Sequence, residues 1–464
     1  MITGRNSFGR RSLPQLPQKL QPGETSTLQL LVGHVVISCI VRSYRHEYQV
    51  FPFKMSSHYE KRLMKTVRLG YLVSHPIQYQ APLLRRIANE PGIDLHVMFM
   101  SDFSLKAYFD KEFGREVAWD VPLTEGYSHE FLPRQPGTGE KSPDDIKTLE
   151  LSKAITRQRF DVLWSHGYSH RTSLAALLRA KRVGIKTLIR SDVQQGTTFR
   201  KPGIRGQVKD QGVTLLFKLI DGFLCAGSLN RQYYADHGVP ERRLIDMPYA
   251  IDNQRFREDA LAAAPNREKL RSALNLEPNR PIILYASKLI ARKKVMDVFA
   301  AYRVAAPRIN PKPYLMVVGD GEDRQCLEDS IASEGLGDDV RSLGFKNQTE
   351  LPAIFDLCDV FVLPAAREPW GLVINEVMCA SKAIVVSDEV GCGPDLVKPG
   401  VNGFVHKVGD IDGFAKALED VLASRETTKE MGDASWEIID KWDFESNVVA
   451  LHKALDLVTK RSSA

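Results

Sequence analysis

From residue 67 onward, short apolar runs alternate with amphipathic segments of helical period. The runs are four to eight residues long and most end at Gly, Ser or His, as buried parallel strands do. Strands that alternate with helices predict a parallel sheet with helices on both faces. The first half of the pattern places strands at 67–73, 93–100, 160–165, 186–190, 221–226 and 244–247, and helices at 81–89, 169–182 and 230–237.

The alternation starts again after a polar segment, residues 253–280, which we interpret as the connection between two domains plus a helix. The predicted fold is α/β, with two doubly wound Rossmann-like domains that face a central cleft, where ligands bind beyond the carboxyl ends of the strands. We expect the first domain at 67–255, the second at 256–440, and a C-terminal helix at 441–464 that packs back on the first domain. The second set of strands is expected at 282–286, 314–318, 340–343, 360–363 and 383–387, with helices between them and at 412–423 and 444–460.

Residues 1–66 differ from the rest of the chain. They hold ten Lys or Arg and three Asp or Glu, a charge of +7, whereas the 464-residue chain carries +6, so the folded body is nearly neutral and no nucleic-acid partner is expected. The apolar stretch at 28–41 is shorter than the roughly 20 residues that cross a bilayer, and no small-residue cleavage site follows it. We interpret 1–66 as an extension without ordered structure, with alternative starts at Met55 and Met64; a membrane-anchoring arm is the other interpretation.

Composition excludes several classes of protein. The six cysteines include no C-x-x-C pair, which indicates a reducing compartment without a disulfide framework or structural zinc. The D-x-D triplet at 410–412 follows Gly409 and starts a predicted helix, so we assign it to helix capping rather than to a metal. The chain has no G-x-x-x-x-G-K-[ST] loop and no G-x-G-x-x-G after the first strand, which argues against a P-loop NTPase and a dinucleotide-binding oxidoreductase.

The most informative segment runs from residue 367 to 376, where two carboxylates, Glu368 and Glu376, lie eight residues apart. Glu368 is predicted in a loop, Pro369 and Gly371 at the start of a helix, and Glu376 about one turn inside it. The unpaired amides and the dipole of a helix N-terminus bind phosphate. Carboxylates on both sides of that phosphate can accept hydrogen bonds from hydroxyls, and this is the layout of a nucleotide sugar.

Two further loops of the second domain follow predicted strands. Lys288 and Lys293 lie five residues apart after strand 282–286, so both could reach one diphosphate, although a solvated loop gives the same pattern. Gly319 and Asp320 belong to a V-G-D-G turn after strand 314–318. Glycine there permits close approach of the backbone to a ligand, but such pairs also form ordinary turns.

Polar side chains also follow two strands of the first domain. His166 lies at the carboxyl end of strand 160–165 and is predicted to face the cleft; the alternative is a histidine that bonds its own turn. His75 and Gln78 follow strand 67–73 in the same way. We expect these two side chains to receive an acceptor hydroxyl.

Taken together, these stretches resemble glycosyltransferase family 4, the retaining nucleotide-sugar glycosyltransferases of the GT-B fold. The E-x7-E motif of the family is similar to residues 368–376, its G-R-L-x-x-x-K-G signature to 287–294, and its V-G-x-G turn to 318–321. Its P-N-G-V-D element resembles 248–252, and its later glycine, acid, glycine run resembles 391–403. The resemblance covers about residues 67–460 and is strongest from 282 to 420; its specificity comes from the order of several motifs.

The resemblance implies a role for each candidate residue. Glu376 would bond the ribose hydroxyls and Glu368 the donor sugar. Lys288 and Lys293 would neutralise the diphosphate, and His166 would approach the transferred sugar. The amides of Gly371, Leu372 and Val373 would hold phosphate or sugar oxygens, and the base would lie near Gly344 and Phe345.

The sequence departs from the family pattern at several positions. Lys288 stands in place of an arginine and lacks its planar, two-pronged guanidinium. Ser287 and Lys294 replace glycines, Asp395 replaces a glutamate, and Ser381 replaces a glycine. None of these changes removes both sides of the phosphate site, so we expect an active enzyme.

The resemblance implies a hexosyl- or related transferase that moves a sugar from a UDP-, GDP- or ADP-linked donor to a glycan or lipid-linked acceptor with retention. The expected reaction is front-face substitution without a metal or other cofactor, in surface polysaccharide or lipopolysaccharide biosynthesis. We expect a cytoplasmic protein and leave open a peripheral contact with the inner face of the membrane. A sugar-nucleotide epimerase of the same fold would change the donor without an acceptor, and a non-catalytic sugar-nucleotide-binding subunit would bind it without turnover.

Overall fold

The computed structural model describes residues 25–32, 35–44, 47–51, 66–138, 146–194 and 204–459, and the chain divides into two compact units, 1–65 and 66–464. In the first unit, β1 (Thr25–Val32), β2 (Val35–Tyr44) and β3 (Glu47–Phe51) pair as an antiparallel sheet. We expected an extension without ordered structure here. The run VVISCIV at 35–41 is rich in β-branched residues, which favour extended backbone. The rest of that expectation lies outside the described residues.

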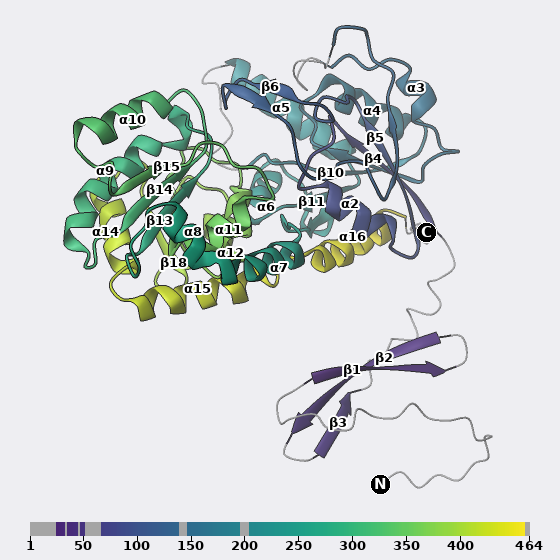
Figure 1. Cartoon of the computed structure of the whole chain (residues 1–464). Helices are drawn as coiled ribbons and strands as arrows, with labels where there is room; N and C mark the ends of the chain where they lie inside the picture. Colours follow the sequence, from purple (N-terminus) through teal and green to yellow (C-terminus); the bar gives the residue numbers. More distant parts are fainter. Residues whose placement is uncertain are drawn as a thin grey trace. The chain divides into compact units, whose positions relative to one another are not determined.

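The first half of the second unit contains a seven-stranded parallel sheet with the order β12-β11-β10-β9-β4-β5-β8 (Figure 1). Its central strands are buried along nearly their whole length, which explains why they form continuous apolar runs in the sequence. The strands are β4 (Val67–Val73), β5 (Ile93–Phe99), β8 (Ser128–Phe131), β9 (Val162–His166), β10 (Lys186–Arg190), β11 (Gly222–Cys225) and β12 (Leu244–Asp246). The helices are α2 (Ala81–Ala88), α3 (Leu151–Ala154), α4 (Arg171–Arg182), α5 (Ile204–Leu219) and α6 (Ser228–Asp236).

The second half repeats this plan with a six-stranded parallel sheet of order β15-β14-β13-β16-β17-β18. The chain order reverses between β13 and β16, so the loops after these strands diverge and leave a crevice at the carboxyl edge. The strands are β13 (Ile282–Ala286), β14 (Tyr314–Val318), β15 (Val340–Ser342), β16 (Val360–Leu363), β17 (Ala383–Ser387) and β18 (Gly403–His406). The helices are α7 (Asn253–Ala263), α8 (Arg267–Ala273), α9 (Val295–Ala305), α10 (Arg324–Ser333), α11 (Leu351–Leu357), α12 (Leu372–Met378), α13 (Gly393–Leu396), α14 (Ile411–Val421) and α15 (Arg425–Ile439).

The predicted α/β fold with two doubly wound sheets is therefore confirmed. Asp410 is the N-cap residue of α14, and its Oδ1 accepts the Gly413 N–H at 2.9 Å, so the D-x-D triplet caps a helix as predicted. Among the helices of the described residues, none combines the length and the apolar content needed to cross a bilayer.

Two further elements link the halves of the second unit. A short antiparallel hairpin, β6 (Tyr108–Asp110) and β7 (Arg115–Val117), follows β5. The last helix, α16 (Phe444–Thr459), comes after the second sheet in the sequence but packs on the first, beside α2 (Figure 1). Val448, Leu451 and Leu455 of α16 belong to the same buried cluster as Leu69 and Trp164.

Candidate functional site

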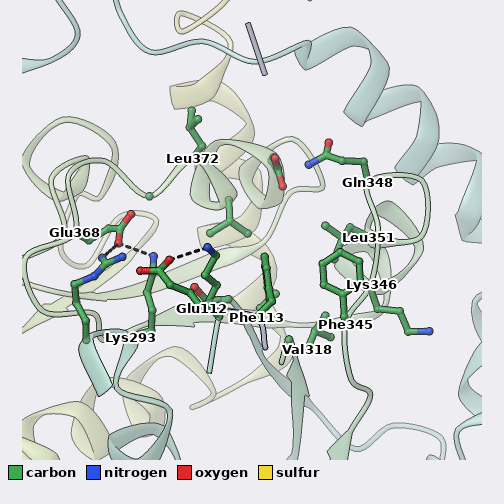
Figure 2. Close-up of a pocket in the computed structure, with 18 of the residues that line it drawn as sticks. Glu112, Phe113, Lys293, Val318, Phe345, Lys346, Gln348, Leu351, Glu368 and Leu372 are labelled. Carbon is green, nitrogen blue, oxygen red and sulfur yellow. Dashed lines mark hydrogen bonds and ion pairs between the residues drawn. The ribbon is translucent and has the colours of Figure 1, made fainter. Parts of the chain in front are cut away.

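The crevice of the second sheet holds a pocket of about 360 Å³ (Figure 2). It is bounded by the loops after β13, β14 and β15, by the segment that leads into α12, and by residues 112–119 of the first domain. This is the position at which doubly wound sheets bind ligands. The predicted residues that line it are Lys288, Lys293, Gly319, Phe345, Glu368, Gly371, Leu372, Val373 and Glu376.

The start of α12 presents backbone amides to this pocket. Gly371 precedes the helix with a left-handed backbone conformation, φ 91°. A Cβ atom there would lie 3.2 Å from Leu363 Cδ2 and 3.3 Å from Val390 Cγ1, so glycine avoids both strain and crowding. The first N–H groups of a helix have no partner within the helix, and Gly371, Leu372 and Val373 all line the pocket. This end of the pocket suits an anion.

Glu368 is held by two cations of the loop after β13. Its Oε2 accepts from Lys293 Nζ at 2.5 Å and from Arg292 Nη1 at 2.7 Å (Figure 2 marks the Lys293 contact). Burial lowers the pKa of Lys293, while the attraction of Glu368 raises it, and the two side chains are only 12% and 11% exposed. The family resemblance placed Glu368 at the sugar and Lys293 at the diphosphate as separate contacts. The structure joins them into one cluster and adds Arg292.

Lys288, on the same loop, is paired with the first domain. Its Nζ donates to Glu112 Oε2 at 2.7 Å and to Asp110 Oδ2 at 3.1 Å. The ammonium also lies 4.7 Å from the centre of the Phe113 ring. Lys288 and Lys293 therefore do not share one anion in this structure, because each is paired with a carboxylate.

Glu376 lies one turn into α12 and is buried, with 8% of its surface exposed. Burial raises the pKa of Glu376 to about 7, against the opposing effects of Arg255 and of a hydrogen bond from Gln348. Because Glu376 and Gln348 both line the pocket, this carboxyl group can meet a ligand while it titrates near neutral pH.

The turn after β14 requires glycine. Gly319 has φ 138°, and a Cβ atom there would lie 1.9 Å from the Ser287 carbonyl oxygen. The Gly319 N–H donates to the Gly344 carbonyl at 2.9 Å, which ties the loops after β14 and β15 together. Asp320 turns toward Arg324, with an Oδ2 to Nη1 distance of 3.1 Å. Phe345 lines the pocket, whereas the predicted Asp320 and Gly344 are not among its lining residues.

His166 ends β9 in the first domain and lies outside the pocket described above. The Gln80 amide nitrogen lies 3.0 Å from His166 Nε2, and burial together with the nearby charge of Arg190 lowers the pKa of His166 to about 3. The imidazole is therefore neutral at physiological pH. Asp192, 3.9 Å from His166 Nε2, has a pKa raised to about 6 by burial, and the charge of Glu368 contributes to that rise.

His75 and Gln78 also lie outside the pocket lining. His75 Nδ1 is 2.9 Å from Ser74 Oγ, and its ring meets Phe103 edge-on at 5.6 Å. His75 lies close enough to His166 for its charge to lower the pKa of His166, so the two imidazoles belong to one polar region of the first domain. Gln78 is half-buried.

Several residues of this region were missed from the sequence. Arg292 adjoins Lys293 in the loop after strand 282–286, and Asp192 follows strand 186–190 as His166 follows its own strand. Ligands bind beyond the carboxyl ends of parallel strands, so the same reasoning could have predicted Arg292 and Asp192. Glu112, Phe113 and Trp119 also line the pocket, but they lie on a hairpin and loop whose short strands gave no periodic signal. Their approach to the second domain is a tertiary contact that no local pattern encodes.

The fold is GT-B. The crystal structure of Anabaena Alr3699/HepE in complex with UDP has a TM-score of 0.63 to this chain at 17% sequence identity, covering 84% of this chain and 99% of that one. Residues 266–437, most of the second domain, match the family described as glycosyl transferases group 1.

The first curated relatives are glycosyltransferases by name. The alpha-D-kanosaminyltransferase of Streptomyces kanamyceticus is 29% identical over 42% of this chain and 49% of that protein. The UDP-Gal:alpha-D-GlcNAc-diphosphoundecaprenol alpha-1,3-galactosyltransferase of Escherichia coli is 26% identical over 59% of this chain and 70% of that protein. The chain spans about half the length of the first curated relatives it matches. These matches support a transferase.

Proposed function

We propose that this protein is a retaining glycosyltransferase that moves a hexosyl or related group from a nucleotide-diphosphate donor to a glycan or lipid-linked acceptor. One observation carries the proposal: a single pocket combines the Arg292, Lys293 and Glu368 cluster, the amides at the start of α12, and the buried Glu376. Cations and bare amides suit a diphosphate, and the two carboxylates suit the hydroxyls on either side of it.

The cationic cluster would act on the leaving group. Breaking the anomeric C–O bond leaves negative charge on the diphosphate, and donors already aimed at that position stabilise it without reorganisation. Lys293 and Arg292 are fixed by Glu368 before any ligand arrives, so their positions are preorganised. We propose that these side chains and the α12 amides neutralise the diphosphate, with no metal ion taking part.

Retention would proceed by substitution at the front face of the sugar. A double displacement needs a carboxylate nucleophile, but Oε2 of Glu368 is occupied by two cations, which lowers its nucleophilicity. We propose that the departing phosphate accepts the proton of the acceptor hydroxyl. His166, neutral at physiological pH, would exchange hydrogen bonds with the transferred sugar rather than carry charge.

The proposed donor is linked to UDP, GDP or ADP, with UDP the first to test because the E. coli relative is named for UDP-Gal and the Anabaena structure holds UDP. The acceptor would enter along the first domain past His75 and Gln78. We place the reaction in surface polysaccharide or lipopolysaccharide biosynthesis, on the cytoplasmic side, with peripheral contact at the inner face of the membrane.

The test is a panel of UDP-, GDP- and ADP-sugars offered to the purified protein with glycan and lipid-linked acceptors. Binding of one nucleotide class, followed by sugar transfer with retained anomeric configuration in the product, is the expected result. Incubation of the donor alone separates an epimerase, which would alter the donor without an acceptor. Binding without turnover on any acceptor indicates a non-catalytic subunit, and no binding of any nucleotide sugar overturns the proposal.

A further inference from the structure

A hairpin of the first domain reaches across to the pocket of the second. It comprises β6, β7 and the following loop to residue 120. Three hydrogen bonds hold its far end to the second domain. Asn347 Nδ2 donates to the Ala118 carbonyl at 2.7 Å, and the Thr349 N–H and Oγ1 donate to Asp120 Oδ2 at 3.2 and 2.6 Å. The hairpin is therefore tied to both domains.

The tip of the hairpin lies against the wall where the base is expected. The Phe113 ring meets Phe345 edge-on, with 5.1 Å between ring centres and an interplanar angle of 85°. The Arg115 guanidinium lies over the same ring, 4.8 Å from the centre of Phe345. A Cβ atom on Gly321 would lie 2.9 Å from the Glu112 carbonyl oxygen, so the glycine leaves space for the hairpin backbone.

The carboxylates of the hairpin form ion pairs with one cation of the pocket, Lys288. Glu112 and Asp110 both accept from Lys288 Nζ, at 2.7 Å and 3.1 Å. Carboxylate oxygens are hydrogen-bond acceptors for an ammonium, as phosphate oxygens are. Glu112 is 53% exposed and Lys288 25% exposed, and a pair with such access to water contributes little to stability, whereas Asp110 is only 13% exposed. The lysine that the diphosphate needs is therefore held by Glu112 through a readily exchanged contact and by Asp110 through a more enclosed one.

We infer that this hairpin is part of the donor site: Asp110 and Glu112 hold Lys288 until the donor diphosphate replaces them, and Phe113 forms a wall for the base beside Phe345. The inference rests on the proposed function and extends it, because it assigns donor recognition to both domains. Donor binding is then an exchange of anions at Lys288 rather than entry into an empty site. The two carboxylates weaken donor binding, and the aromatic ring strengthens it.

The role of the two carboxylates and the role of Phe113 can be tested separately by isothermal titration calorimetry with inorganic pyrophosphate and with UDP, GDP and ADP. The first variant combines Asp110→Asn with Glu112→Gln. Asp110 Oδ1 accepts the N–H groups of Glu112 and Phe113 at 2.9 and 3.0 Å, and an asparagine oxygen can keep both bonds, so the turn is preserved. The control combines Glu116→Gln with Glu125→Gln, two exposed carboxylates that form no ion pair among the described residues and whose removal changes the net charge equally.

The Asp110→Asn and Glu112→Gln variant should bind pyrophosphate and the nucleoside diphosphates about two- to fivefold more tightly than the control variant. Phe113→Ala should weaken nucleoside diphosphates by about two- to tenfold and leave pyrophosphate unchanged, and Phe113→Tyr should restore the affinity. Unchanged or weaker pyrophosphate binding without the two carboxylates overturns the inference. If the wild-type protein binds no nucleotide, the proposed function fails. If it binds a nucleotide, and Glu376→Gln weakens that binding while the hairpin variants have no effect on it, only the inference fails.

Discussion

The pKa of Glu376 makes donor affinity depend on pH in a defined way. If the ribose hydroxyls donate to the ionised carboxylate, only that form is competent to bind. With a pKa of about 7, about one molecule in eleven is ionised at pH 6 and about ten in eleven at pH 8. The affinity for the donor should therefore rise about tenfold from pH 6 to pH 8, and Glu376→Gln should remove this dependence and weaken binding at pH 8 by about tenfold or more.

The ligand for this measurement is an intact nucleotide sugar. A free terminal phosphate titrates near pH 6 and would add a pH dependence of its own, whereas the diphosphate of a nucleotide sugar is esterified at both ends. Asp192, whose pKa is raised to about 6, titrates in the same range, but the Glu376→Gln variant retains it. Calorimetry at pH 6, 7 and 8 compares the two proteins. A flat wild-type profile, or a slope that survives in Glu376→Gln, refutes the assigned role.

Four further outcomes follow from the geometry. The raised pKa of Glu376 means that the folded protein holds this proton more tightly than the unfolded chain does, so the free energy of unfolding falls from about pH 4.5 to about pH 7. In denaturant unfolding, the free energy of unfolding of Glu376→Gln should exceed that of the wild type by up to about 3 kcal/mol at pH 8, and by less at pH 5. Lys293→Met should lower turnover about 10²–10³-fold in a transfer assay, because a preorganised leaving-group donor is lost; a loss of less than tenfold contradicts that role. Gly319→Ala should cost about 2 kcal/mol or more in thermal unfolding, whereas Gly337→Ala, where a Cβ meets nothing within 4 Å, should stay within about 0.5 kcal/mol. His166→Asn should lower kcat and leave nucleotide affinity unchanged; because His166 stays neutral, kcat of the wild type and of this variant should have the same pH dependence between pH 5 and 8.

The sequence predicted the sheets because their signal is local. Strands such as β13 and β17 are buried throughout, and their apolar runs have the bounds that the pattern gave. The layout of residues 368–376 could also be predicted from the sequence. Pro and Gly mark the start of α12, and the two carboxylates have fixed positions relative to that start.

The pairings of charges could not be obtained in this way. Lys288 and Lys293 lie on one loop with similar surroundings in sequence, yet one pairs with Glu368 of its own domain and the other with Glu112, 176 residues away. The packing of the two domains against each other decides which carboxylate each lysine pairs with. The periodicity of the apolar residues gives no information on that packing. The same limit applies to Asp192, whose pKa is raised mainly by burial and further by the charge of Glu368 in the other domain.

The position of α16 has a consequence for how the chain is made. Leu451 and Leu455 complete a core that begins at Leu69, so the first domain is discontinuous in sequence. Domains commonly fold in the order in which the ribosome releases them. Here the N-terminal sheet emerges early but keeps an apolar face uncovered until the second domain has been synthesised and the final helix has emerged. The nascent protein must hold that face in solution, or under a chaperone, from the completion of β12 at residue 246 until α16 ends at residue 459.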